Sequence, residues 1–271
     1  MRPLIFDMAR GSSVDGPGIR TVVFFKGCPL RCAWCQNPES QSPEPETVVY
    51  PERCIGCGRC AEGCHSLARR TVGEYEPPDR LARLIIRDKV FYRVSSGGVT
   101  FSGGEPLLYI DYLSEVAERL KHEEISIAVE TCGDFDYDHL NRSLLPFIDL
   151  FLFDIKLMDA TLHARYTGKS NARILENFGR LLGAGKRVVP RIPLIPGYTA
   201  DEENLSQIAA FLARHRIRDV ELLPYNPSGI EKWGRLGKTP PAPLTPTPLT
   251  RADEQRWADV FFRQFDALRH Q

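Results

Sequence analysis

Six short segments rich in apolar and β-branched residues alternate with helical patterns along most of this chain. The segments span residues 20–26, 98–102, 125–131, 149–155, 187–194 and 219–224. Helical spacing recurs at Tyr109, Leu113, Val116 and Leu120, and at Leu205, Ile208, Ala209 and Leu212, where Thr199-x-x-Glu202 predicts a capping box. Such alternation predicts a parallel sheet with helices outside it. Six units are too few for a closed eight-stranded barrel, so we predict an α/β fold, a partial, open (β/α)6 TIM-like barrel.

Two regions interrupt the alternation. Residues 37–78 are rich in Pro, Glu and Cys without a clear period, which indicates a small insert. Residues 239–249 are proline-rich and predicted to be extended. A final amphipathic helix, predicted to cover the barrel, has on one side Trp257, Phe261, Phe265 and Leu268. We therefore predict a barrel from 1–36 and 79–238, an insert at 37–78, and a proline-rich segment with a helix at 239–271.

Seven of the eight cysteines fall between Cys28 and Cys64, which is too crowded for a disulfide framework spread over a domain. Metal binding is therefore favoured over disulfides. Three of them, Cys28, Cys32 and Cys35, follow the first β segment with the spacing C-x3-C-x2-C. A 4Fe–4S cluster takes four thiolates, so a loop that offers three leaves one iron free to bind something else. A zinc knuckle and metal-free thiols are the alternatives.

Charge and hydropathy exclude several classes of function. The chain has 35 basic and 35 acidic residues, a formal net charge of +0, so no nucleic-acid or membrane surface is predicted. No apolar run approaches the roughly 20 residues that a membrane-spanning helix needs. Asp7 and Arg10 stand where a secretory signal would be apolar, so we expect no export and a cytoplasmic protein.

Polar groups close or follow most of the predicted strands, at the end where barrel enzymes place their chemistry, and Arg191 lies within the fifth strand. After the cysteine loop come Gly103-Gly104-Glu105-Pro106, Glu130-Thr131-Cys132-Gly133, Asp154-Ile155-Lys156, Arg191 and Asn226. Lys156 and Arg191 are able to pair with a carboxylate. Asp154 accepts from Lys156 or ligates a cation with Glu130 or Thr131, which makes a monovalent cation a further candidate. A plain turn at Gly103–Pro106 and ordinary ion pairs elsewhere are the alternatives.

The spacing C-x3-C-x-aromatic-C, with Trp34 as the aromatic residue, resembles the radical S-adenosylmethionine (SAM) superfamily. The resemblance implies that the free iron binds the amino and carboxylate groups of SAM. It also implies that an electron from the cluster cleaves SAM to methionine and a 5′-deoxyadenosyl radical, and that Gly103, Gly104 and Glu105 hold the methionyl amino group. The other cofactor-binding residues implied are Trp34, Cys35, Gln36, Glu130, Thr131, Asp154, Ile155, Lys156, Arg191 and Asn226.

Further motifs resemble the glycyl-radical-enzyme activating enzymes, typified by the pyruvate formate-lyase-activating enzyme. They are SVDGPGIR at 13–20, GCPLRCAWCQNPE at 27–39, YTGKSN at 166–171, ILEN at 174–177 and R-x-P-L-I-P-G at 191–197, within a match over about residues 5–230. The resemblance implies that Asp15 contacts the partner's glycine loop and that Asp15 and Lys156 are catalytic. A plain turn is the alternative for Asp15. Asn226 stands where close formate-lyase-activating relatives carry a titratable His, which argues against that activator itself.

The insert carries Cys54-x2-Cys57-x2-Cys60-x3-Cys64, which reads like one half of a bacterial ferredoxin. We predict a second 4Fe–4S cluster held most simply by these four thiolates. A zinc site, or His65 replacing or accompanying Cys64, is the alternative. Such a cluster carries electrons towards the SAM cluster or helps to dock the partner. Cys132 is interpreted as a small buried residue.

The predicted function is an oxidoreductase of anaerobic metabolism that installs a glycyl radical on a partner enzyme. Its partners are then a glycyl radical enzyme and a flavodoxin or ferredoxin electron donor, and we expect a monomer. One rival is a radical SAM enzyme that acts on a small molecule or a peptide. The other is a passive iron–sulfur electron carrier, which leaves Glu105, Lys156 and Arg191 unexplained.

Overall fold

The computed structural model describes residues 2–60 and 63–269; the remaining residues of the predicted barrel, insert and C-terminal ranges lie outside the described chain. The strands are β1 Ile5–Ser12, β2 Arg20–Phe25, β3 Glu46–Val49, β4 Arg69–Val72, β5 Gly98–Gly103, β6 Ser126–Thr131, β7 Leu150–Asp154, β8 Val188–Leu194 and β9 Glu221–Pro224. The α-helices are α1 Pro78–Ile86, α2 Lys89–Ser95, α3 Ile110–His122, α4 Tyr137–Ser143, α5 Ala160–Thr167, α6 Ala172–Gly183, α7 Glu202–Arg214, α8 Ser228–Arg235 and α9 Arg251–Arg269. Short 3₁₀ turns are η1 Pro38–Ser40, η2 Pro51–Arg53, η3 Pro106–Tyr109 and η4 Leu145–Phe147.

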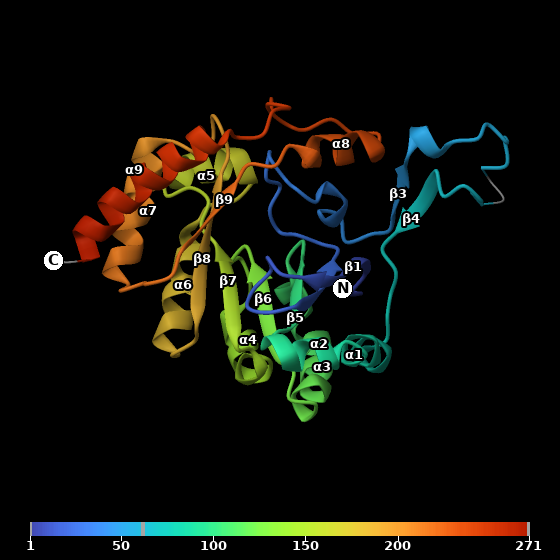
Figure 1. The fold of residues 1–271 in the computed structure, drawn as a ribbon, viewed down its shortest axis with the longest axis horizontal. Coiled ribbons are helices and arrows are strands. Elements are labelled where there is room, and N and C mark those ends of the chain that lie inside the picture. Colours follow the sequence, from blue (N-terminus) through green and yellow to red (C-terminus); the bar gives the residue numbers. More distant parts are fainter. Residues whose placement is uncertain (1, 61–62, 270–271) are drawn as a thin grey trace.

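The main sheet is curved and open, which confirms the predicted partial barrel (Figure 1). Its order is β1-β2-β5-β6-β7-β8-β9, and all neighbours from β2 to β9 run parallel. Six of the seven strands are those predicted. The seventh, β1, pairs antiparallel with β2 and was not predicted, because it lies at an edge, is largely exposed and has no apolar run. β1 and β9 therefore flank the opening of the barrel.

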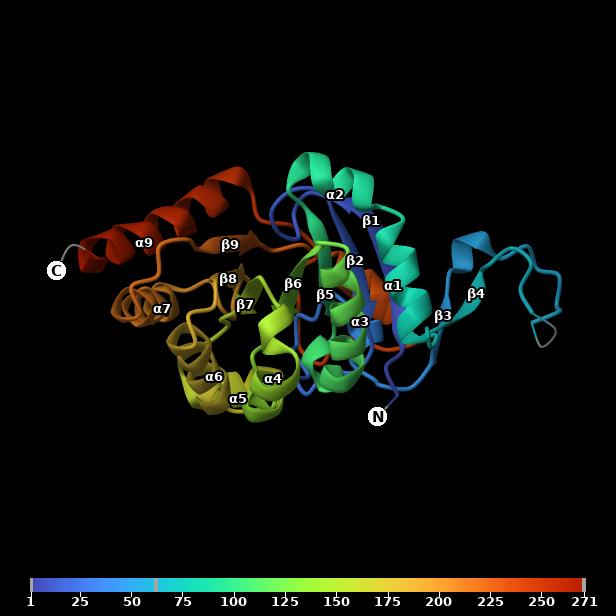
Figure 2. The same cartoon turned by 90° about the horizontal axis from the view of Figure 1, so that it is seen from below.

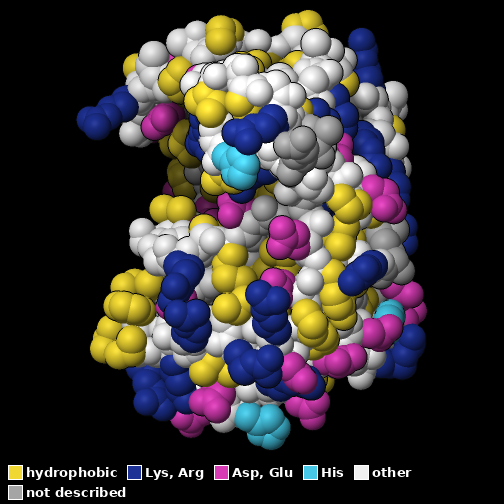
Figure 3. Space-filling model, turned by 90° about the vertical axis from the view of Figure 1, so that its right-hand side faces the viewer, with side chains coloured by type: hydrophobic (Ala, Val, Ile, Leu, Met, Phe, Trp, Pro, Cys, Tyr) yellow, Lys and Arg dark blue, Asp and Glu magenta, His cyan; other side chains and the backbone are white. Residues whose placement is uncertain are grey.

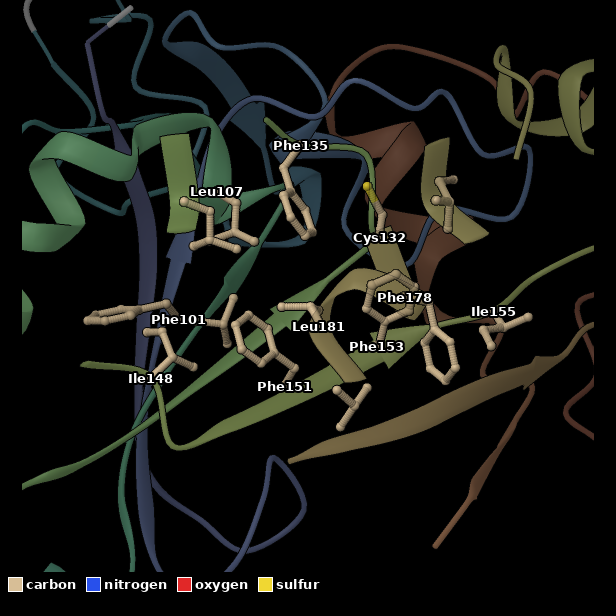
Figure 4. Packing of buried hydrophobic residues seen from close by; sticks show 14 of the residues in the cluster. Phe101, Leu107, Cys132, Phe135, Ile148, Phe151, Phe153, Ile155, Phe178 and Leu181 are labelled. Carbon is tan, nitrogen blue, oxygen red and sulfur yellow. The ribbon is translucent and has the colours of Figure 1, made fainter. Parts of the chain in front are cut away.

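The outer face of the sheet packs against helices. Side chains alternate between the faces of a strand, so Phe101, Phe151 and Phe153 all point outward. The ring of Phe153 meets Phe178 of α6 edge to face at 5.2 Å between centroids. Figure 4 shows these rings together with Leu181, and Figure 2 shows α3, α4 and α6 along this side of the sheet. This layer holds most of the buried apolar core.

The inner face changes from apolar to polar along the strands. Ala128, Leu150, Leu152 and Val189 form a small buried cluster there. Two residues further on, the same alternation brings Glu130, Asp154 and Arg191 to the inner face near the strand ends. These three strands therefore direct charged side chains into the barrel towards its C-terminal rim.

One predicted helix signal was wrong. The predicted capping box makes Thr199 the cap and starts the helix at Ala200, but α7 begins at Glu202 and its cap is Asp201, whose Oδ1 accepts from the backbone N–H of Asn204 at 3.0 Å. The hydroxyl of Thr199 instead accepts from the backbone N–H of Ile195 at 2.8 Å. The preceding turn uses this Thr, which leaves Asp201 to satisfy the free N–H groups of the helix.

The C-terminal helix packs on α7 at one end of the sheet (Figures 1 and 2). Phe261 and Phe265 are buried, as their spacing predicted. Leu268 is 37% exposed, so the apolar stripe ends before it. The helix thus thickens the outer layer beside α7.

The insert forms a two-stranded hairpin, β3 with β4, that projects from the barrel (Figure 1). Its strands have four residues each, too few to show a period in the sequence. The buried ammonium of Lys26, just after β2, donates to Glu46 at 2.9 Å and anchors the hairpin. On the face that carries the insert, basic and acidic side chains are interspersed (Figure 3). Among the described helices, none has the length and apolar character to cross a membrane.

Candidate functional site

The cysteine loop follows β2 and is held by backbone hydrogen bonds to distant segments. Gly27 N–H donates to the carbonyl of Ser40 at 2.6 Å. The N–H groups of Arg31 and Ala33 donate to the carbonyls of Thr167 and Tyr166, at 2.7 and 2.9 Å. The loop is therefore a fixed part of the barrel rim rather than a free excursion.

The three thiols are largely shielded from water. Cys32 is buried, and Cys28 and Cys35 are half-buried. Burial raises the pKa of Cys35 to about 11 and that of Cys32 well above its usual range, whereas a hydrogen bond with the Cys132 thiol lowers the pKa of Cys28. Metal binding here must release protons, as it does at any thiolate site. Across residues 2–60 and 63–269, no group of three or more His, Cys, Asp or Glu side chains converges closely enough to hold an ion.

The donor set nevertheless fits an iron–sulfur cluster. Three thiols on one anchored loop are soft ligands, and they share their surroundings with the ammonium of Lys156, whose charge favours the thiolate of Cys32. Neutral thiols with a nearby cation are suited to become thiolates when a metal arrives. This loop therefore remains the candidate cluster site.

The two glycines after β5 serve close packing against the chain itself. A Cβ at Gly103, whose φ is +113°, would lie 2.3 Å from the backbone N of Phe25. A Cβ at Gly104 would lie 2.1 Å from the carbonyl oxygen of Gly27. The family resemblance implied that these glycines hold the methionyl amino group; in the structure, the end of β2 and the base of the cysteine loop pack directly against them.

The carboxylate of Glu105 is fully buried and already has partners. It accepts from the Thr131 hydroxyl at 2.8 and 2.9 Å, from Cys132 N–H at 2.8 Å and from Leu107 N–H at 3.1 Å. Burial raises its pKa to about 7 against these hydrogen bonds. Glu105 thus ties the turn after β5 to the end of β6, a position from which it supports the loop.

A buried ion pair at the end of β7 faces the cysteine loop. Lys156, 8% exposed, donates to Asp154 Oδ2 at 2.6 Å. Burial opposes the charge on Lys156, but the carboxylate of Asp154 and the neighbouring thiols raise its pKa above the usual range. Among the described residues, Asp154 Oδ1 is buried and has no hydrogen-bond partner. That oxygen is an unused acceptor beside the cluster site, as a bound cationic group would require. Ile155, between the pair, is buried.

Arg191 joins three elements inside the barrel. Its guanidinium contacts Glu130 at 2.8 Å and Glu221 at 2.7 Å, and it donates to the carbonyl of Val14 at 2.8 Å. The hydroxyl of Ser102 donates to the other oxygen of Glu130. Burial raises the pKa of Glu130, and the nearby charge of Arg191 only partly opposes that rise. The pKa of Arg191 is raised because its two carboxylate partners outweigh the effect of its burial. Three of its five N–H donors are used by described residues, and the other two have no partner among them.

Asp15 lies in the loop between β1 and β2 that Arg191 reaches. It is half-exposed, its carboxylate accepts from the Ser12 hydroxyl, and its carbonyl accepts from the Thr100 hydroxyl at 2.7 Å. Arg20, almost fully buried, donates to that hydroxyl at 2.7 Å and to the Pro17 carbonyl at 3.2 Å. Burial lowers the pKa of Arg20 to about 10. The loop is therefore held against the open side of the barrel.

The remaining predicted residues lie on the side of α8. The Trp34 ring is buried 5.5 Å from the ring of Tyr198. Gln36 donates to the Ser228 hydroxyl at 2.5 Å, and Asn226 Oδ1 accepts from Ser228 N–H at 3.0 Å. Both polar side chains are exposed and hold the start of α8 beside the cysteine loop.

The insert cysteines are not brought together in the described part of the hairpin. Cys54, Cys57 and Cys60 are exposed, and the thiol of Cys64 lies 3.4 Å from the Ser66 hydroxyl, which lowers the pKa of Cys64. His65 is exposed. A second cluster on this insert stays a prediction.

Four residues with roles at the site were missed by sequence reasoning, namely Arg20, Thr100, Ser102 and Glu221. Thr100 and Ser102 share the inner face of β5, and strand alternation from the outward Phe101 would have placed them there. Glu221, at the start of the last strand, has no sequence signal that marks it as a partner of Arg191.

Comparison with known proteins agrees with these motifs. The family model of the radical SAM superfamily matches residues 22–208. The chain is 44% identical to the pyruvate formate-lyase 2-activating enzyme of Escherichia coli, with 87% of this chain and 81% of that protein covered. It is 37% identical to the indoleacetate decarboxylase activating enzyme of Tractidigestivibacter scatoligenes, with 96% and 94% covered. It is 35% identical to the benzylsuccinate synthase activating enzyme of Thauera aromatica, with 87% and 82% covered.

Solved structures share the architecture. A domain of a pyruvate-formate lyase-activating enzyme from Bacteroides vulgatus matches with a TM-score of 0.50 at 29% identity, over 62% of this chain and 94% of that one. Streptococcus suis SuiB matches with a TM-score of 0.59 at 15% identity, over 89% of this chain and 45% of that one. The second likeness concerns the fold alone.

Proposed function

This chain belongs to the radical SAM superfamily and, within it, to the activating enzymes of glycyl radical enzymes, and from that premise we propose how its residues divide the work. The enzyme reductively cleaves SAM and takes a hydrogen atom from a glycine of a partner enzyme, which leaves a glycyl radical on the partner. The observation that carries the proposal is the cysteine loop placed beside the Lys156–Asp154 pair at the barrel rim. A passive electron carrier has no need for that pair.

Cys28, Cys32 and Cys35 would hold the 4Fe–4S cluster, and SAM would bind at its fourth iron. When bound, the cluster and SAM supply the one-electron reduction and the carbon-centred radical chemistry. Lys156 is placed to neutralise a carboxylate of SAM, since its charge is favoured by Asp154. The unpartnered Asp154 Oδ1 would accept from the amino group. Glu105 orients the turn below them through four hydrogen bonds.

The partner's glycine would approach through the open side of the barrel, next to Asp15. The loop there is fixed on its inner side by Arg191, while Val14 is 76% exposed. Helix α2 adjoins the loop, because Ile19 N–H donates to the Ser95 hydroxyl at 2.8 Å. On α2, Val90, Phe91 and Val94 are exposed by 61, 52 and 79%. An apolar surface of this kind is typical of a protein-binding site, which supports a macromolecular substrate on this side.

Three finer elements belong to the same proposal. The insert would hold a second 4Fe–4S cluster through Cys54, Cys57, Cys60 and Cys64, and a monovalent cation would sit near Asp154, Glu130 and Thr131. A flavodoxin or ferredoxin would supply electrons to the enzyme, which would act as a monomer.

The proposal is tested by anaerobic reconstitution with iron and sulfide, followed by SAM, a photoreductant and a candidate glycyl radical enzyme. We expect 5′-deoxyadenosine and an organic radical signal on the partner, split into a doublet by the glycine α-hydrogen. Replacing the partner's glycine by alanine should abolish that doublet. Cleavage of SAM with a signal on a small molecule or peptide, and none on any such partner, would favour the rival radical SAM function instead.

A further inference from the structure

A basic pocket lies on the outer side of the cysteine loop, and no role in SAM binding accounts for it. Its volume is about 520 Å³, and its walls include Arg31, Arg165, Tyr166, Tyr198 and the prolines of the 241–243 segment. Among the described residues that line it, two are cationic and none is acidic. Both arginines are exposed, and no ion pair of either with a carboxylate is present in the described structure. The pocket thus offers uncompensated positive charge to an outside partner.

The pocket shares its floor with the metal-binding loop. Arg31 lies between Cys28 and Cys32 in the chain, and its side chain donates to the carbonyl of Cys28 at 2.5 Å. Ala33, also in the wall, donates its N–H to the carbonyl of Tyr166 at 2.9 Å. A group bound in this pocket would be separated from the proposed cluster only by the cysteine loop that would hold the cluster.

Aromatic rings continue from the pocket to the loop. The ring of Tyr166 meets that of Tyr198 edge to face at 4.9 Å, and Tyr198 lies 5.5 Å from Trp34, the neighbour of Cys35. Arg165 stands 5.3 Å from the centre of the Tyr166 ring. Tyr198 also donates to the carbonyl of Pro243 at 2.6 Å, which holds the proline-rich segment as the far wall. The walls therefore combine aromatic rings with cationic side chains, and both kinds of group suit a planar, negatively charged ring system.

From this arrangement we infer that the pocket is the docking site of an acidic flavoprotein of the flavodoxin type, which delivers one electron to the cluster across the cysteine loop. The inference rests on the proposed function, because it names where that function's electron donor binds. Opposite charges steer such encounters, and electron-transfer complexes use small interfaces. One electron passes from the reduced flavin to the oxidised cluster, and no bond is made or broken. The insert hairpin, β3 with β4, projects away from α5, the helix that carries Arg165, so a donor bound at the pocket need not contact the insert (Figure 1).

The test compares two matched charge reversals in the reconstituted enzyme. Arg165→Glu alters the pocket, and Arg70→Glu alters an equally exposed arginine on the insert, 5.7 Å from the ring of Tyr50. We expect Arg165→Glu to weaken the binding of oxidised flavodoxin about tenfold, since like charges at an interface are strongly disfavoured. Arg70→Glu should change binding by less than about twofold, as remote rim charges do. Added salt should weaken the wild-type complex more steeply than the Arg165→Glu complex.

A second measurement separates docking from the reaction itself. Photoreduced deazaflavin, a small molecule, reduces the cluster without docking, so both variants should cleave SAM at the wild-type rate when it is the reductant. With limiting reduced flavodoxin, cluster reduction should slow in Arg165→Glu only. The inference is overturned if Arg165→Glu binds flavodoxin as tightly as the wild type, or if Arg70→Glu weakens flavodoxin binding as much as Arg165→Glu does. It is also overturned if Arg165 affects the binding of ferredoxin but not of flavodoxin, or if Arg165→Glu loses the cleavage of SAM driven by photoreduced deazaflavin. Failure of the wild-type enzyme to cleave SAM with light would instead reject the proposed function, and the binding titration would still decide the docking site.

Discussion

The close fit between Gly104 and the cysteine loop predicts a large effect from a single methyl group. In Gly104→Ala the new Cβ would stand 2.1 Å from the Gly27 carbonyl oxygen and 2.9 Å from that of Ser40. Ordinary contact begins at 3.4 Å, so the first distance must grow by about 1.3 Å. Both neighbours are backbone atoms, and Gly27 directly precedes Cys28, a proposed cluster ligand. The same shift would break the hydrogen bond from Glu105 N–H to Gly27, now 2.8 Å.

We expect Gly104→Ala to lower the free energy of unfolding by about 3 kcal/mol, at the upper end of overpacking effects. Its iron content after reconstitution should fall well below that of the wild type. The matched control is Gly183→Ala at the end of α6, where nothing lies within 4 Å of the new Cβ. That change should raise stability by about 0.5–1 kcal/mol. Denaturant unfolding and iron analysis measure both variants; full iron loading and wild-type stability in Gly104→Ala would refute the packing argument.

Three further predictions follow from the charged groups and the insert. Because burial raises the pKa of Glu105 from 4.5 to about 7, the folded chain binds this proton more tightly than the unfolded chain, and stability from this group is lost as the pH rises through that window. The free-energy cost of Glu105→Gln should therefore be smaller at pH 8 than at pH 5 by about 2.5 kcal/mol, measured by urea unfolding; an equal cost at both would reject the shift. Arg191→Met should lower the free energy of unfolding by about 3–5 kcal/mol, because it leaves the carboxylate of Glu130 unpaired inside the barrel. The control Arg180→Met should lower it by at most about 1 kcal/mol, because the ion pair of Arg180 with Asp138 is exposed. Cys57→Ser should remove about four irons per chain while SAM still perturbs the remaining cluster, and unchanged iron would exclude the second cluster.

The sequence predicted the elements whose signals are local. The six parallel strands have apolar runs, and the cysteine spacing points to a metal site before any contact is known. β1 escaped prediction because edge strands need no apolar run, and the insert hairpin because four-residue strands show no period. The prediction that the candidate site lies at the C-terminal ends of the strands followed from barrel topology alone.

The side-chain partners at the site depended on tertiary structure. Glu105 was expected to face a ligand, yet its carboxylate binds Thr131 and Cys132, which come from the next strand. Arg191 was expected to pair with the carboxylate of a ligand, yet its guanidinium binds Glu130, Glu221 and the carbonyl of Val14 within the chain. Nothing in the sequence near Val14 indicates that contact, because 177 positions separate it from Arg191. Such pairings arise when the curved sheet brings its inner faces together.

Cys28, Cys32 and Cys35 are proposed to hold a cluster with one iron open to SAM, and every assigned role depends on that cluster. The most direct measurement is the electron paramagnetic resonance spectrum of the reduced enzyme, recorded on a variant that lacks the four insert cysteines. The account predicts about four irons per chain, a cluster signal that shifts when SAM is added, and loss of both in Cys32→Ser. Zinc in place of iron, or a signal that SAM leaves unchanged, would contradict it.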